Sequence, residues 1–123
     1  MSTAFDRLDE QARIHHLADV AARAAPRWGV SPAASLRLLN ISENATYRID
    51  DPAAPAPLIL RVHRTGYHSY DAVRTELAWM KALQAEAGVE TPQAVPALDG
   101  ELIHRIATPA LDEERFVVMF AFI

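Results

Sequence analysis

Apolar residues recur along the first part of the chain at the spacing of a helix. Residues 4–25 contain neither glycine nor proline and are rich in alanine, which favours an α-helix. One face of this helix is apolar and consists of Ile14, Leu17, Ala18, Ala21 and Ala24. A second group lies on a different face: Phe5, Leu8 and Ala12. We therefore expect the helix to break near Gln11 or to contact two surfaces, and Pro26 ends it.

Five later segments have the short, bounded apolar patterns of β-strands. They are residues 35–42, 45–50, 58–63, 101–106 and 115–123. The last segment is almost continuously apolar, which predicts a strand buried on both faces. Residues 91–97 contain two prolines and are predicted to form a loop, and Asp99-Gly100 predicts a turn.

A second helix is expected between the third and fourth strands. Ser69 suits its N-cap, and Gly88 suits the stop after Ala87. Strands joined by tight turns predict an α+β fold. The predicted fold consists of a five-stranded, mainly antiparallel sheet with one packed helix, preceded by an N-terminal helical extension. We divide the chain into this extension, residues 1–32, and the sheet domain, residues 33–123.

Composition narrows the classes of function. The chain has 123 residues, a net charge of −4 and no cysteine, which excludes disulfides, thiolate catalysis and cysteine-ligated zinc. The balance of charge argues against a nucleic-acid partner. The acidic start lacks the apolar core of a signal peptide, and the longest apolar run, residues 116–123, is too short to cross a membrane. A cytoplasmic protein without a membrane partner is therefore expected.

Two charged residues stand in apolar surroundings. Glu76 falls within the apolar stripe of the second helix, and Arg61 lies in the middle of the third strand. Burying an unpaired charge costs roughly several kcal/mol. We therefore expect Arg61 and Glu76 to form an ion pair. A strand cation that pairs with a helix glutamate, just after a tight hairpin, is the arrangement that holds ATP phosphates in protein kinases.

Three stretches together resemble the phosphotransferase superfamily that includes aminoglycoside phosphotransferases, choline kinases and bacterial homoserine kinases. They are NISENATYRI at 40–49, ILRVHRTGYH at 59–68 and TELAWMKAL at 75–83. The resemblance covers residues 35–123, the N-terminal lobe of that fold. It implies an ATP-dependent kinase with magnesium as cofactor, acting on the hydroxyl of a small molecule or a protein.

The resemblance also implies roles for individual residues. The loop over the phosphates would be formed by Ser42, Glu43 and Asn44. Arg61 would contact the α- and β-phosphates, and Glu76 would pair with Arg61. The hinge that reads the adenine edge through its backbone would be approached or formed by Met119, Phe120, Ala121 and Phe122, in a run that ends at Ile123.

This chain departs from the family pattern in two ways. The phosphate loop has no glycine, although Asn44 tolerates a left-handed backbone and the Ser42 hydroxyl can donate to a phosphate. The family's catalytic aspartate and its magnesium ligands lie beyond the hinge. We therefore expect no catalytic residue and no metal ligand in this chain, and no phosphoryl transfer by the chain alone.

Other interpretations remain open at this point. Arg61 and Glu76 could form a purely structural ion pair, and residues 42–44 an ordinary hairpin turn. The chain could instead be a non-catalytic partner-binding or regulatory module, or a truncated fragment, and its lobe-docking face could promote self-association. The five histidines lack the spacing of metal ligands, and Trp28 and Trp79 are expected to pack rather than to stack on ligands.

Overall fold

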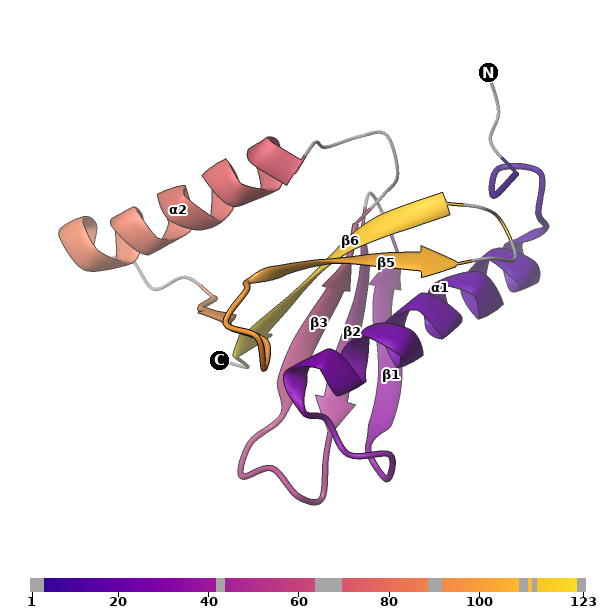
Figure 1. The fold of residues 1–123 in the computed structure, drawn as a ribbon, viewed down its shortest axis with the longest axis horizontal. Coiled ribbons are helices and arrows are strands. Elements are labelled where there is room, and N and C mark those ends of the chain that lie inside the picture. Colours follow the sequence, from indigo (N-terminus) through magenta and orange to yellow (C-terminus); the bar gives the residue numbers. More distant parts are fainter. Residues whose placement is uncertain are drawn as a thin grey trace.

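The computed structural model of the protein describes residues 4–41, 44–63, 70–88, 92–108, 111 and 113–121. The helices and the antiparallel sheet form an α+β arrangement, drawn in Figure 1. In chain order the elements are helix α1 (Glu10–Ala24), the short 3-10 helix η1 (Ala25–Trp28), β1 (Ser35–Ile41), β2 (Ala45–Asp50), β3 (Leu58–Val62), α2 (Tyr70–Ala87), β4 (Ala94–Val95), β5 (Ile103–Thr108) and β6 (Glu113–Ala121).

All strand pairs found among the described residues are antiparallel. The sheet runs in the order β1-β2-β3-β6-β4, and β5 also pairs with β6. The long strand β6 is central, because β3 pairs along one edge while β4 and β5 share the other. The predicted fold class is thus confirmed, with six strands in the described part of the chain rather than five.

The additional strand is β4, which lies inside the segment predicted to be a loop. Prolines at 92 and 96 limit the strand to two residues, Ala94 and Val95, and these pair with Phe120 and Met119. Pairing continues just beyond the strand, where the backbone N–H of Ala121 donates to the Gln93 carbonyl at 2.9 Å. A two-residue bridge is too short to leave a periodic signal in a sequence.

Strand β6 separates two hydrophobic cores, which explains its apolar run. Val117 and Met119 belong to the core on the α1 side, whereas Val118 and Phe120 belong to the core on the α2 side. Successive strand residues point to opposite faces, so the part of β6 that is covered on both sides, residues 117–120, is apolar at every position. The prediction that this segment is buried on both faces is confirmed.

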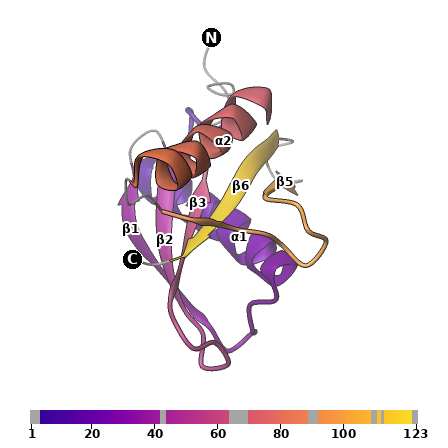
Figure 2. The same cartoon turned by 90° about the vertical axis from the view of Figure 1, so that its left-hand side faces the viewer.

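Helix α1 packs on the sheet and supplies much of the larger core. Its buried residues include Leu17, Val20, Ala21 and Ala24, which meet Tyr47, Leu60 and Met119 from the sheet. Figures 1 and 2 show α1 and α2 on opposite sides of the strands. The N-terminal helix therefore covers the face of the sheet that α2 leaves open.

Local signals fix the ends of the helices. The Asp9 carboxylate accepts a hydrogen bond from the Ala12 backbone at 2.7 Å, so α1 begins at Glu10, close to the expected break. The turn after η1 uses Gly29, whose φ is 77°. Helix α2 ends at Ala87 before Gly88, whose φ of 66° suits glycine, as predicted. The predicted cap, Ser69, lies outside the described residues.

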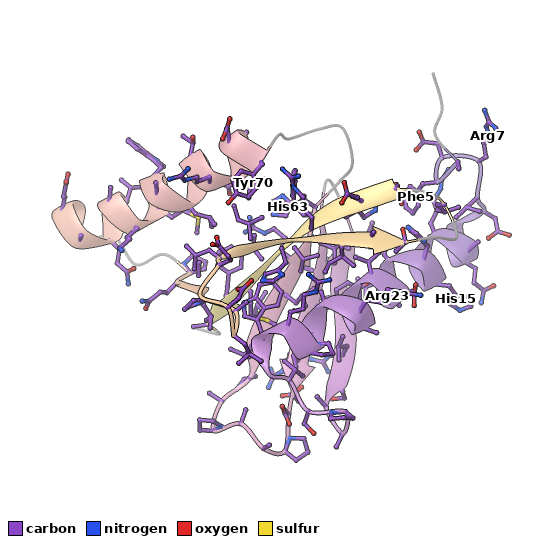
Figure 3. All side chains as sticks on the ribbon, viewed as in Figure 1. Phe5, Arg7, His15, Arg23, His63 and Tyr70 are labelled. Carbon is purple, nitrogen blue, oxygen red and sulfur yellow. The ribbon has the colours of Figure 1, made fainter. Side chains whose placement is uncertain are left out.

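A buried ionic cluster ties α1 to the start of β6. The Glu113 carboxylate lies 2.6 Å from Nε2 of His16 and 3.2 Å from Nε of Arg115. Arg115 also donates to the His63 carbonyl and lies over the Phe5 ring, at 4.4 Å from the centroid. Figure 3 labels Phe5 at this end of α1. We call His16, Glu113 and Arg115 the helix-anchoring cluster.

A second contact anchors the other end of α1 through η1. Arg27 Nη1 lies 3.1 Å from Nδ1 of His104, whose Nε2 lies 3.1 Å from the Asp99 carboxylate. The backbone N–H of Glu101 and the His104 side chain lower the pKa of Asp99. The Trp28 indole donates to the Val95 carbonyl at 2.8 Å, so this tryptophan packs as expected.

No helix in the described part of the chain is long and apolar enough to cross a membrane.

Candidate functional site

Arg61 and Glu76 meet between the sheet and helix α2. Nη1 of Arg61 lies 3.3 Å from Oε1 of Glu76, so the predicted pair forms. Strand alternation sends Arg61 to the same side as Ile59, which packs against the α2 core, while Leu60 and Val62 enter the α1 core. Arg61 therefore lies on the α2 face of the sheet.

The burial predicted for Glu76 is wrong. Its side chain is 44% exposed, and that of Arg61 is 22% exposed. Helix α2 buries Val73 and Leu77, with Tyr70 and Met80 packed against them, and Glu76 lies at the border of this stripe. An exposed pair with one contact contributes only about 0–1 kcal/mol to stability. The pair therefore contributes little to the stability of the fold.

The strand register places Arg61 beside the β1–β2 hairpin. Arg61 is opposite Thr46 of β2, and Thr46 is opposite Asn40 of β1. Directly paired residues share a face of the sheet, so all three side chains lie on the α2 face. Thr46 follows Asn44 by two residues. The three paired residues therefore lie next to the loop proposed to cover the phosphates. Ser42 and Glu43 lie outside the described residues.

Asn44 is the described member of that loop. Its Oδ1 atom is buried and has no hydrogen-bond partner among the described residues. An amide side chain at this point can both donate and accept, and it stands at the start of β2, where the chain leaves the hairpin. This oxygen therefore needs a hydrogen-bond donor that the described residues do not supply.

Two further arginines lie on the same face of the sheet. Arg37 of β1 is opposite Arg48 of β2, and Arg48 is opposite Ile59 of β3. Arg48 is partly neutralised by Asp50, at 3.1 Å, and Arg37 is exposed. Cross-strand pairs of like charge are unfavourable by themselves, and they attract anions. Sequence reasoning missed these residues, although alternation from Arg61 through the hairpin would have found them.

The residues predicted for the hinge lie in or next to strand β6. The Met119 side chain is fully buried in the α1 core, and the Phe120 side chain is buried in the α2 core. The N–H of Ala121 is engaged by Gln93. Side chains at 119 and 120 are therefore enclosed, and the Ala121 donor is used within the sheet. Phe122 lies outside the described residues.

The Phe120 ring has a contact that the sequence did not indicate. The guanidinium carbon of Arg61 lies over this ring, at 4.6 Å from its centroid. Cation–π contacts of this kind contribute about 0.5–2 kcal/mol, more when water is excluded. Arg61 is thus bounded by an aromatic face and by a carboxylate.

Neighbouring residues complete the α2 side. Tyr70 at the start of α2 packs its ring edge to face on Phe116, with centroids 6.0 Å apart, and His63 donates its backbone N–H to the Phe116 carbonyl. Figure 3 shows Tyr70 and His63 near the beginning of α2.

Trp79 points outward from α2 and is 65% exposed, so the packing role expected for it is wrong.

The described residues do not form a metal centre. They contain no group of three or more histidine, aspartate or glutamate side chains placed to hold one ion. His16 and His104 are each engaged with carboxylates in the contacts that anchor α1. A shallow hollow lies at the turn of residues 50–57, at the opposite end of β2 and β3 from the β1–β2 hairpin. The chemistry of the Arg61 face suits a polyphosphate, and within the described residues it does not suit a magnesium ion held by protein ligands alone.

Comparison with known proteins supports a relation to phosphotransferases. The model of the phosphotransferase enzyme family matches residues 35–119. A solved structure, described as the microcompartment-associated aminopropanol kinase, is 40% identical with a TM-score of 0.79. The match covers 86% of this chain and 31% of that kinase chain. No curated protein matches the sequence.

Proposed function

Because the chain belongs to the phosphotransferase enzyme family, we propose that it forms the nucleotide-binding part of an ATP-dependent kinase. The observation behind this proposal is the Arg61–Glu76 contact on the sheet face that also holds Thr46 and ends at the β1–β2 hairpin. In kinases a strand cation oriented by a helix glutamate holds the phosphates beneath such a hairpin.

The guanidinium of Arg61 can bind a carboxylate and a phosphate together. It has five N–H donors in a planar fork, and one of its nitrogens faces Glu76. The remaining donors can bind phosphate oxygens in charge-assisted hydrogen bonds, which are roughly twice as strong as neutral ones. Arg37 and Arg48 add positive charge along the same face, which favours the approach of ATP or ADP.

The transfer reaction itself is proposed for a longer assembly. The chain spans 31% of the similar kinase's length, and its described residues hold no cluster of metal-ligating side chains. We assign the catalytic base and the magnesium ligands to polypeptide outside the described residues. The isolated chain is proposed to bind nucleotide without transferring phosphate.

The acceptor is proposed to be a hydroxyl group of a small molecule. The similar solved structure is named as an aminopropanol kinase, and this chain shares 40% identity with it over the aligned region. An amino alcohol is therefore the first acceptor to test, and a protein hydroxyl is the second. Both tests require a protein that also contains the catalytic residues.

Calorimetric titration with ADP and with magnesium-ATP tests the binding proposal. We expect weak binding by the 123-residue chain and a loss of roughly ten- to a hundred-fold in Arg61→Ala, because hydrogen bonds to charged groups contribute about 1.5–3 kcal/mol. Arg23→Ala is the matched control, since Arg23 pairs with Asp19 on the exposed side of α1. Figure 3 labels Arg23 on that helix. Equal affinities of the wild type and Arg61→Ala, or no binding by the folded chain, would refute the proposal.

A further inference from the structure

The aromatic ring beneath Arg61 suggests a role for Phe120 that differs from hinge recognition. We propose that Phe120 is a positioning residue whose ring fixes the guanidinium of Arg61 for contact with the nucleotide phosphates. The proposal rests on the nucleotide-binding function proposed above. It starts from the contact of 4.6 Å between the Arg61 guanidinium carbon and the Phe120 centroid.

The strand register explains how the two side chains meet. Phe120 of β6 is directly opposite Ile59 of β3, and Arg61 is opposite Val118. Phe120 and Arg61 are thus diagonal neighbours on one face, a separation that long and aromatic side chains can bridge. The ring is held in the α2 core with Val73 and Leu77 and is almost fully buried. It is therefore a fixed surface, and Arg61 leans onto it.

The contact with Glu76 does not hold Arg61 by itself. It is a single contact of 3.3 Å to a side chain that is 44% exposed. Long charged side chains lose conformational freedom when an exposed pair forms, which offsets most of the attraction. A buried ring beneath the guanidinium carbon limits that freedom, and the N–H donors point outward in the plane of the guanidinium. The edges stay available to Glu76 and to an anion at the same time.

This arrangement also accounts for arginine at position 61. A lysine ammonium is a compact charge without a plane to lie over the ring, and it has three donors rather than five. Arginine can therefore contact the Phe120 ring and still offer more donors to an anion than lysine could. The ring therefore acts on phosphate binding through Arg61, and no contact between the ring and the nucleotide is required.

A double-mutant cycle on ADP affinity separates this role from others. Phe120→Leu keeps an apolar side chain and removes the ring, and we expect it to weaken ADP binding about five-fold, the scale of one cation–π contact. The same substitution in an Arg61→Met background should cause no further loss. Unchanged affinity in Phe120→Leu, or an equal five-fold loss with Met at 61, would overturn the proposal.

Phe116→Leu is the matched control for loss of a ring. Phe116 lies on the same face of β6 and packs with Tyr70, and its cationic neighbour is Arg105, at 5.5 Å. We expect its ADP affinity to equal that of the wild type. A loss as large as in Phe120→Leu would attribute the effect to general loosening of the α2 core and would overturn the proposal.

Adenosine tests whether the ring serves the base instead. It lacks phosphates, so a ring that acts through Arg61 should leave its affinity unchanged in Phe120→Leu, as measured by NMR titration. Equal losses for adenosine and ADP would place the ring at the base and overturn the proposal. Absence of ADP binding by the wild type would refute both proposals, whereas binding that needs Arg61 but not Phe120 would refute this one alone.

A measurement on the wild-type chain covers the case in which Phe120→Leu fails to fold. The ring should shift the side-chain proton resonances of Arg61 upfield, and these resonances are identified by their loss in Arg61→Met. Resonances at the frequencies of exposed arginines such as Arg37 would refute the contact, and an upfield shift that changes when ADP is added would support the proposal.

Discussion

Removing the carboxylate of Glu113 should destabilise the fold more than any surface change. Glu113 contacts His16 at 2.6 Å and Arg115 at 3.2 Å, and its side chain is 14% exposed. The Arg115 side chain is 3% exposed, and its Nη2 atom already lacks a hydrogen-bond partner within the described part of the chain. The substitution Glu113→Ala leaves a buried cation without its carboxylate and removes the contact between His16 of α1 and the start of β6.

The expected loss follows from the partners that remain. Breaking a buried ion pair by removing one member costs about 3–5 kcal/mol. Arg115 keeps its bond to the His63 carbonyl and its contact with the Phe5 ring, so we expect the lower end, about 3 kcal/mol. That is a large part of the roughly 5–15 kcal/mol by which small domains are stable. Glu113→Gln, which can still accept one hydrogen bond, should lose less.

Urea unfolding followed by far-ultraviolet circular dichroism measures this loss. Glu114→Ala is the control, because Glu114 is the exposed neighbour on the same strand. We expect a clearly lower unfolding midpoint for Glu113→Ala and little change for Glu114→Ala, with the same dependence on urea. Equal midpoints for the two variants would refute the reasoning that the helix-anchoring cluster stabilises the fold.

Three more changes test the packing of the α1 side. Burial raises the pKa of Tyr47 from 10.0 to about 12, so the unfolded chain ionises first and stability should fall by about 2 kcal/mol between pH 10 and 12. Tyr47→Phe should remove its share of this fall in urea titrations at several pH values, and an identical fall in the variant would contradict the assignment. Trp28→Phe loses the bond to the Val95 carbonyl and should cost about 1 kcal/mol, whereas an unchanged urea midpoint would count against that bond. Deleting residues 1–32 uncovers Met119 and the larger core, so cooperative thermal unfolding should disappear, and a sharp transition in the deletion variant would show that the sheet folds without α1.

Elements with strong local signals could be predicted from the sequence. The almost continuously apolar run of residues 115–123 indicated a strand buried on both faces, because a strand with one face in solvent alternates between apolar and polar residues. Gly88 marked the end of α2, and Asp9 caps α1 close to the expected break. The Arg61–Glu76 pair was also predicted, since a cation in mid-strand needs a nearby anion.

Features that depend on tertiary placement could not be predicted. The exposure of Glu76 depends on how α2 is placed against the sheet. A helical wheel gives the directions of side chains around the helix but not the placement of the helix. The same placement leaves Trp79 exposed. Strand β4 is a two-residue pairing, and the Phe120 ring meets Arg61 only through the register of β3 with β6. Each of these depends on contacts between distant segments.

Mapping ADP onto the chain by NMR is the most direct test that this sheet face binds nucleotide phosphates. We predict that ADP shifts the backbone resonance of Thr46 and the side-chain resonances of Arg61, and that in Arg61→Ala the Thr46 shift requires a much higher ADP concentration. Shifts confined to the turn of residues 50–57, or no shifts in a folded chain, would contradict the assignment of the Arg61 face as the nucleotide site.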